Sequence, residues 1–393
     1  MHTLGLYLSI PFCKSKCTYC NFASGVFPAT YFEQYIARLE QDLSSIRVET
    51  QQRHVDLPEV VDSIYLGGGT PSLLPSALIR RLFSAIRRSF AVLPTAEITA
   101  ECAPGQLEDA TLGAIVEAGV NRISFGVQSF IDSEAKHTGR FHTREIALRD
   151  INRVRRAGIS NLSLDLIAGL PGQTRDSWRE SLATLADTGV NHASVYMLEI
   201  DADSRLGREL SSGGLKYYAP QVPSDEAIAD MYSEAVELFA AHGLHQYEIS
   251  NFARAGRESA HNLKYWHRKP YLGLGLDAHS MLRTRSGDAL RFATTDELEP
   301  FLNSSGWNHP HRLSREEEIE EAWFLGLRLN AGVSLGALRA EFGRADVDSF
   351  EPLLTELECH GLITWTADRI ALTTRGRLVS NEVFERFLMV PAA

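Results

Sequence analysis

The sequence predicts an α/β fold, a full or partial β/α barrel of the TIM-barrel kind, followed by a small C-terminal winged-helix-like domain. Short apolar stretches typical of strands alternate with amphipathic stretches typical of helices through the first two-thirds of the chain. Strands separated by helices imply a parallel sheet with right-handed crossovers. Polar residues also recur at or just after the expected strand ends, where such a barrel carries its functional groups.

The expected strands each combine apolar and β-branched residues and precede a turn or a helical stretch. They cover residues 6–10, 63–66, 97–101, 122–126, 162–166 and 193–197. Amphipathic stretches lie between them, for example at residues 30–46 and 76–90.

Functional side chains follow these strands in order. Three cysteines come after the first strand and a glycine run comes after the second. Glu101 ends the third strand, Gln128 follows the fourth, Asp165 lies within the fifth and Glu199 follows the sixth. The carboxyl ends of parallel strands meet at one mouth of a barrel, so we expect these side chains to form a ring there.

Cys13, Cys17 and Cys20 form a CxxxCxxC motif after the first strand. A closed zinc site needs four ligands, and no His or Cys follows Cys20 within the next thirty residues. A disulfide would leave one thiol unpaired and would need an oxidising compartment. Three thiolates suit a cubane iron–sulfur cluster that leaves one iron open, and three unliganded buried thiols are the alternative. Cys102 and Cys359 are isolated and are interpreted as ordinary thiols.

A glycine run, Gly67-Gly68-Gly69-Thr70-Pro71, follows the second strand. It lacks the GxGxxG spacing of a dinucleotide site and the lysine of a P-loop. One interpretation is a tight turn between a strand and a helix. The other is a turn whose backbone approaches a ligand closely, such as the amino group of a small zwitterion.

Composition narrows the class of protein. The net charge of −11 disfavours a general nucleic-acid binder, because phosphate contacts need clustered Lys and Arg. No apolar stretch is long enough to span a bilayer, and the first residues do not resemble a signal peptide. With five cysteines and no leader, we expect a cytoplasmic protein.

The cysteine motif and the GGGTP turn together resemble the radical S-adenosylmethionine (SAM) superfamily. The resemblance implies a four-iron–four-sulfur (4Fe–4S) cluster whose open iron chelates the amino and carboxylate groups of SAM. One electron from the cluster then cleaves SAM to methionine and a 5′-deoxyadenosyl radical. The protein's own part is to position and shield these cofactors.

Further motifs resemble the oxygen-independent coproporphyrinogen III oxidases and their relatives over nearly the whole chain. These motifs are residues 6–7 and 10–13, the FGVQSF run at 125–130 and the DLIAGLP run at 165–171. The resemblance implies that Tyr7, Gly68 and Glu101 contact the cluster-bound SAM. The positions that hold a second SAM in the oxidase correspond here to Tyr19, Gly69, Thr70, Gln128, Arg140 and Asp165.

Two features distinguish the oxidase from its relatives, the radical SAM heme chaperones. The oxidase continues its cysteine motif to CxxxCxxCxC, whereas this chain has Phe22 at the last position. The chaperones carry an HNxxYW motif, and this chain has His261, Asn262, Tyr265 and Trp266 at its defined positions. The resemblance therefore favours a chaperone that binds heme and passes it to respiratory proteins. The alternative is an oxidase that decarboxylates coproporphyrinogen III, so enzymatic activity stays open here.

The HNxxYW motif suits heme on chemical grounds as well. A neutral imidazole is a common axial ligand of heme iron, and aromatic rings offer a flat apolar surface to a porphyrin. We expect a heme contact at His261, with His245, His267 and His279 as alternatives. A loop histidine held by hydrogen bonds is the competing interpretation.

The chain departs from the family pattern at two positions. Ser9 stands where the family often has His, and Asp277 stands where relatives commonly have Gly. Neither position is close to the cysteines in sequence.

We expect a barrel over residues 1–282, with the heme motif region at 245–280. Residues 283–314 are rich in polar residues, Gly and Pro and suggest an irregular connection. Residues 315–393 then form the C-terminal domain, with a helix opened by an acidic run at 316–321, a helix N-cap at Ser334 and a small hairpin at 362–372. Winged-helix domains often bind DNA, but this one is too acidic for that. We therefore expect it to cap the barrel mouth or to provide a protein-docking surface. The resemblance leaves open a homodimer and a peripheral membrane contact.

Overall fold

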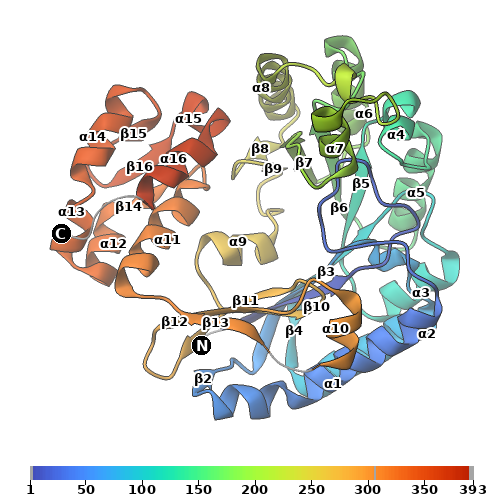
Figure 1. Cartoon of the computed structure of the whole chain (residues 1–393), viewed down its shortest axis with the longest axis horizontal. Helices are drawn as coiled ribbons and strands as arrows, with labels where there is room; N and C mark the ends of the chain where they lie inside the picture. Colours follow the sequence, from blue (N-terminus) through green and yellow to red (C-terminus); the bar gives the residue numbers. More distant parts are fainter. Residues whose placement is uncertain (1–2, 305–306, 389–393) are drawn as a thin grey trace.

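The computed structural model describes residues 3–304 and 307–388 of the 393. Its centre is a sheet whose strands all run in the same direction through the first half of the chain (Figure 1). These parallel strands are β1 (Leu4–Ile10), β3 (Val60–Gly68), β4 (Ala91–Cys102), β5 (Arg122–Gln128), β6 (Asn161–Ala168) and β7 (His192–Met197). Every strand predicted from the sequence is confirmed.

Helices connect the parallel strands and cover the outer face of the sheet (Figure 1). The larger ones are α1 (Thr30–Gln52), α2 (Ser76–Ser89), α3 (Asp109–Glu117), α5 (Arg144–Arg156), α6 (Arg175–Asp187) and α8 (Asp225–Ala241). Shorter segments are α4 (Asp132–His137), α7 (Arg205–Ser212) and the 3-10 turns at Pro71–Leu73 and Ala219–Gln221. The two helices predicted in detail correspond to α1 and α2.

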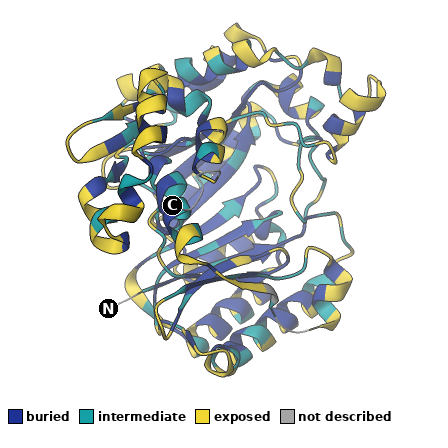
Figure 2. Cartoon of the chain, turned by 60° about the vertical axis from the view of Figure 1, so that its left-hand side comes forward, coloured by how far each residue is buried: buried dark blue, intermediate teal, exposed yellow. Residues whose placement is uncertain are grey.

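The strands alternate between an apolar outer face and a more polar inner face. On β1, Leu4, Leu6 and Leu8 are fully buried in the main core, and Tyr7 and Ser9 point the other way. The same period of two on β5 and β6 places Gln128 and Asp165 on the inner side. Figure 2 shows the inner strands as the most buried part of the molecule. The alternation in the sequence therefore places polar side chains on the inner face of the sheet, toward the interior of the partial barrel.

The sheet extends beyond the parallel strands at both edges. Next to β1 lies β10 (Tyr271–Gly275), which is parallel to it, and then the antiparallel strands β11 (His279–Thr284), β12 (Ala289–Ala293) and β13 (Asn308–Arg312). The short strand β2 (Val55–Asp56) pairs with β11, and β9 (Asn251–Ala253) and β8 (His245–Gln246) follow β7. The described strands run from β13 to β8 without closing, so the barrel is partial.

The expectation of an irregular connection at 283–314 was wrong. This segment completes β11 and supplies β12, α10 (Leu298–Asn303) and β13, although residues 305–306 lie outside the described part. Its strands contain Arg, Asn and His, so they lack the apolar alternation that marks a strand. They form because neighbouring strands supply the backbone hydrogen bonds.

The C-terminal unit consists of helices and a small antiparallel sheet, as predicted. Its helices are α11 (Arg315–Leu327), α12 (Leu335–Phe342), α13 (Arg344–Asp348), α14 (Glu351–Cys359), α15 (Thr374–Leu378) and α16 (Ser380–Phe387). The strands β14 (Val333–Ser334), β16 (Arg369–Leu372) and β15 (Ile363–Trp365) form the sheet in that spatial order. The side chain of Ser334 accepts from the Ala337 N–H, which confirms the predicted N-cap. Residues 389–393 of the expected domain lie outside the described part.

The acidic run at the start of α11 joins this unit to the sheet. Glu318 pairs with Arg283 of β11 at 2.7 Å, and Glu321 makes a bidentate pair with Arg291 of β12. Farther along the chain, the Asn330 N–H donates to the Tyr247 carbonyl at 3.0 Å. The acids of this helix thus neutralise arginines on the sheet. In the part of the chain that the structure describes, no helix is both long and apolar enough to cross a bilayer.

Candidate functional site

The three motif cysteines lie on one loop between β1 and α1 and face a cavity of about 860 Å³. Backbone hydrogen bonds close the base of the loop, from Cys13 N–H to the Gly25 carbonyl at 2.8 Å and from Gly25 N–H to the Pro11 carbonyl at 2.9 Å. The Thr18 N–H donates to the Thr138 carbonyl at 3.1 Å, which ties the far side of the loop to the end of α4. The loop is held by backbone contacts, so all three thiols stay free.

The donor set fits an iron–sulfur cluster better than a single metal ion. Burial raises the pKa of the Cys13 thiol, and the neighbouring Cys20 and Cys17 thiols raise it further. The Cys17 and Cys20 sulfurs therefore both lie within electrostatic reach of Cys13. Among the described residues, however, no three His, Cys, Asp or Glu side chains are close enough to hold one ion. Thiolates of a cubane bind different irons and stand farther apart than ligands of one ion.

The glycine turn lies directly against the start of the cysteine loop. The Gly69 N–H donates to the Ile10 carbonyl and the Thr70 N–H to the Phe12 carbonyl, each at 2.8 Å. Gly68 has a φ of +102°, which only glycine adopts easily. A Cβ on Gly69 would lie 2.7 Å from the Phe12 oxygen. The run is therefore required for the close approach of two backbones at the rim of the cavity.

Glu101 stands at the end of β4 on the wall of the same cavity. The Tyr65 hydroxyl donates to its Oε1 at 2.8 Å. Burial raises the pKa of Glu101 to about 7, against the opposing effect of the Tyr65 hydrogen bond, and the charge of Asp165 raises it further. A carboxyl with this pKa exchanges a proton easily near neutral pH, and a bound cation would keep it ionised.

We expect the raised pKa of Glu101 to make the cluster-free protein less stable as the pH rises from about 4.5 to about 7. The folded state holds a proton that the unfolded state releases, so this contribution is complete below pH 4.5 and is lost above pH 7. Each pKa unit corresponds to about 1.4 kcal/mol, so Glu101→Gln should stabilise the protein at pH 8 by at most about 3 kcal/mol and have little effect at pH 4.5. Urea unfolding at both pH values measures this. A Gln variant that is no more stable than the wild type at pH 8 would contradict it.

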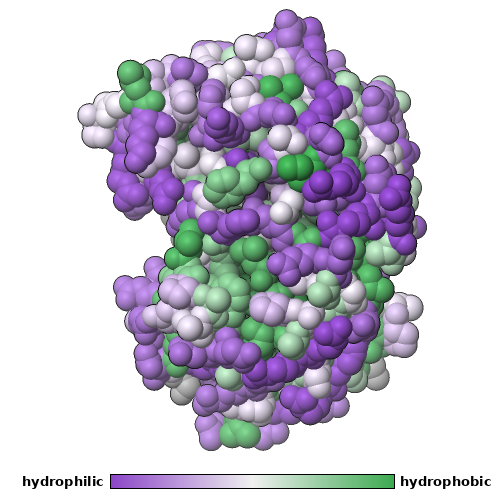
Figure 3. Space-filling view, turned by 90° about the vertical axis from the view of Figure 1, so that its right-hand side faces the viewer, coloured by the Kyte–Doolittle hydropathy of each residue, from purple (hydrophilic) through white to green (hydrophobic). Residues whose placement is uncertain are grey.

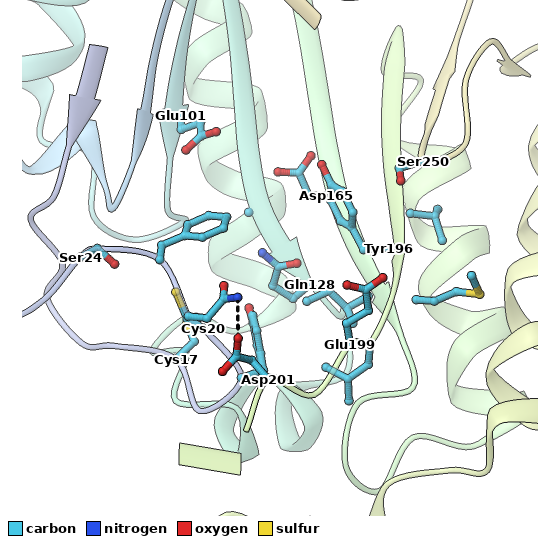
Figure 4. Close-up of a pocket in the computed structure, with 18 of the residues that line it drawn as sticks. Cys17, Cys20, Ser24, Glu101, Gln128, Asp165, Tyr196, Glu199, Asp201 and Ser250 are labelled. Carbon is cyan, nitrogen blue, oxygen red and sulfur yellow. Dashed lines mark hydrogen bonds between the residues drawn. The ribbon is translucent and has the colours of Figure 1, made fainter. Parts of the chain in front are cut away.

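The neighbouring strands β5 and β6 carry further polar groups of the same cavity, including Gln128 and Asp165 (Figure 4). Ser124 donates to Asp165 at 3.2 Å, and burial raises the pKa of Asp165. Gln128 adopts a φ of +70° at the end of β5, a conformation uncommon outside glycine. In the described part of the chain, the buried atoms Gln128 Oε1, Arg140 Nε and Gln106 Oε1 have no hydrogen-bond partner. Buried polar atoms are normally paired, so these three indicate a polar ligand in this cavity.

The structure brings most of the predicted SAM residues together. The residues that line the first cavity with the three cysteines are Tyr19, Gly68, Gly69, Thr70, Glu101, Gln128, Arg140 and Asp165. Tyr7 instead lines a second cavity of about 410 Å³, which shares Gly68 and Phe22 with the first. The two cavities are therefore adjacent compartments on the inner face of the sheet.

Several residues of the first cavity were not predicted from the sequence. Tyr196 and Ser250 come from the β7 and β9 side, and residues 378–382 come from α15 and α16. Arg328, just after α11, places its guanidinium 4.4 Å from the Trp266 ring centre. No local motif marks Arg328 or residues 378–382, because they reach the cavity only through the packing of the C-terminal unit. Figure 3 shows apolar side chains gathered in a band across one face, between more hydrophilic parts of the surface.

The HNxxYW residues lie on α9 (Ala260–Trp266), a short helix inside the partial barrel (Figure 1). His261 is 1% exposed, with Nδ1 3.0 Å from the Ser63 hydroxyl and Nε2 2.8 Å from the Tyr265 hydroxyl. Burial lowers the pKa of His261 to about 3, so the imidazole is neutral. Asn262 is half-buried at the first turn of the helix. Tyr265 and Trp266 line the second cavity.

A partial β/α barrel with a three-cysteine loop and a glycine turn at its mouth defines a radical SAM protein. The Radical SAM superfamily pattern matches residues 7–185, and the HemN C-terminal domain pattern matches residues 313–379. Superfamily membership implies the 4Fe–4S cluster and SAM as cofactors.

The chain is 35% identical to heme chaperone HemW of Bacillus subtilis over 97% of this chain and 98% of that protein. It is 31% identical to heme chaperone HemW of Escherichia coli, over 98% of both chains. The chain therefore belongs to the HemW family of radical SAM proteins. Its fold is also similar to that of coproporphyrinogen III oxidase (HemN) from Escherichia coli, with a TM-score of 0.83 and 24% identity over 98% of this chain and 90% of that one.

Proposed function

We propose that this protein binds heme beside a 4Fe–4S cluster with SAM and passes the heme to heme-accepting respiratory proteins. The observation that carries this proposal is the similarity to HemW proteins, at 31–35% identity over nearly the full length. Phe22 also supports it, because the oxidase family has a further cysteine at this position. Phe22 is 60% exposed and lines both cavities.

We propose that Cys13, Cys17 and Cys20 hold the cluster and that Glu101 accepts the ammonium group of SAM. When bound and reduced by an external electron donor, the cluster would supply the single electron that cleaves SAM. The unpartnered buried atoms of Gln128 and Arg140 support a polar ligand in the same cavity, with hydroxyl and ring nitrogen groups to satisfy them. With its pKa raised to about 7, Glu101 is partly protonated near neutral pH. The carboxyl would lose this proton when a cation binds, which supports a role in holding the ammonium group.

The second candidate function is oxidative decarboxylation of coproporphyrinogen III. The positions that correspond to the second SAM of the oxidase also line the large cavity, which favours keeping this candidate. The two functions differ in what they do with a tetrapyrrole. A chaperone binds heme and releases it unchanged, whereas the oxidase removes carboxyl groups from a heme precursor.

One anaerobic experiment separates the two. The reconstituted protein is titrated with heme and followed by absorbance, and a second sample is incubated with SAM, a reductant and coproporphyrinogen III. We expect saturable heme binding near one equivalent and no decarboxylated product. Product formation without specific heme binding would contradict the proposal and would identify an oxidase.

A further inference from the structure

His261 has a structural role in the barrel. Both of its ring nitrogens have hydroxyl partners, Ser63 and Tyr265, and the ring is almost completely buried. The Glu97 carboxylate accepts the N–H groups of Ala260 and His261, each at 3.1 Å, which fixes the start of α9 against β4. Iron ligation by His261 would break one of these contacts and open the centre of the barrel.

The second cavity offers the surface that a porphyrin needs. Its walls include Tyr7 from β1, Tyr265 and Trp266 from α9, and Tyr271 from β10. The Tyr265 and Tyr271 rings are perpendicular, with centres 4.6 Å apart, so the wall is a packed aromatic surface. Its volume of about 410 Å³ lies within the usual range of about 300–1,000 Å³ for small-molecule sites.

One accessible histidine faces this cavity. Among the described residues that line the two cavities, His279 is the only histidine. Its side chain is 71% exposed, so a ligand can reach it from solvent. Its Nε2 is 3.7 Å from the Asp277 Oδ1, longer than a hydrogen bond, and a small turn of either side chain would let the carboxylate orient the ring as partners of metal-bound imidazoles do.

Asp277 adopts a left-handed backbone conformation beside His279. Its φ is +52°, in the region that glycine adopts freely and that Asp adopts more often than most other residues. Ser9 and Asp277 both line the second cavity. Ser9 is a short side chain on β1, and the Asp277 carboxylate faces His279.

We propose that the second cavity holds the heme, with His279 as its axial ligand and Asp277 as the residue that positions the imidazole. This inference rests on the proposed heme binding and specifies its site. The cavity shares Gly68 and Phe22 with the cluster cavity, so the heme lies next to the cluster and SAM. The HNxxYW motif then serves the site through Tyr265 and Trp266, and His261 supports the helix that carries them.

The test compares heme spectra of the reconstituted wild type with those of His279→Gly, His267→Ala and His261→Gln. His267 is exposed and lines neither cavity, so His267→Ala is the matched control. We expect His279→Gly to lose the spectrum of the imidazole-ligated heme while keeping its cluster absorbance, and added imidazole to restore that spectrum. Asp277→Asn should weaken heme affinity about tenfold, as loss of an orienting partner does at metal sites.

The outcomes separate this inference from the proposed function. If the wild type binds no heme, both fail. If the wild type binds heme and His279→Gly keeps the wild-type spectrum, the inference alone is overturned. If His261→Gln loses the spectrum with its cluster intact and imidazole restores it, His261 is the ligand and the inference is likewise overturned.

Discussion

Cys17→Ala is expected to abolish the broad iron–sulfur absorbance after anaerobic reconstitution. A cubane held by three thiolates keeps one iron open, and the loss of Cys17 would leave a second iron without a protein ligand. The loop itself should survive, because its anchors are backbone bonds from Cys13 and Thr18 that do not use the thiol. The effect should therefore appear in the iron and sulfide content and leave the fold unchanged.

Cys359→Ala is the matched control for this variant. Cys359 is an exposed free thiol at the end of α14, outside both cavities. It should reconstitute to the same iron and sulfide content as the wild type. A Cys17→Ala protein with wild-type iron content would show that the cluster assignment is wrong.

The second large effect is expected from Gly69→Ala. The added Cβ would lie 2.7 Å from the Phe12 oxygen and 2.8 Å from the Pro11 carbonyl carbon, and backbone atoms cannot move aside as a flexible side chain can. The turn must shift, which weakens the bonds that Gly69 and Thr70 donate to the cysteine loop. We expect a loss of about 1–3 kcal/mol in the free energy of unfolding, together with impaired cluster reconstitution.

Gly113→Ala provides the comparison for the glycine turn. Gly113 lies within α3, and a Cβ there would have no neighbour within 4 Å. Alanine in a helix interior is favoured over glycine by roughly 0.5–1 kcal/mol, so this variant should be slightly more stable than the wild type. Urea unfolding of the two variants measures the difference. Equal stability and equal cluster content in both would refute the close contact between turn and loop.

The parallel half of the fold was predictable because each strand has one fully apolar face. Leu4, Leu6 and Leu8 pack against helices, and that requirement is visible as a local pattern. The same holds for Ser334, whose capping contact involves a residue only three positions away. The strands within residues 283–314 escaped prediction because they lack a regular apolar alternation, although each pairs with the next strand along the chain.

The first cavity was predictable in outline, because functional residues of a β/α barrel collect at the carboxyl ends of its strands. Arg328 and residues 378–382 were missed, since they arrive from a separate unit. The surroundings of His261 could not be predicted from the sequence either. Its Nδ1 partner, Ser63, lies 198 residues away, and only the packed structure shows that the imidazole is enclosed.

Transfer of heme tests the central claim most directly. The cluster-loaded protein is saturated with heme, freed of excess heme, and mixed anaerobically with the heme-free form of a heme-containing respiratory protein, with heme-loaded albumin as the control donor. We predict that the acceptor gains its own heme spectrum as the donor loses its spectrum, and that it does so faster than from albumin. Heme that stays on this protein, or that leaves no faster than from albumin, would contradict a chaperone function.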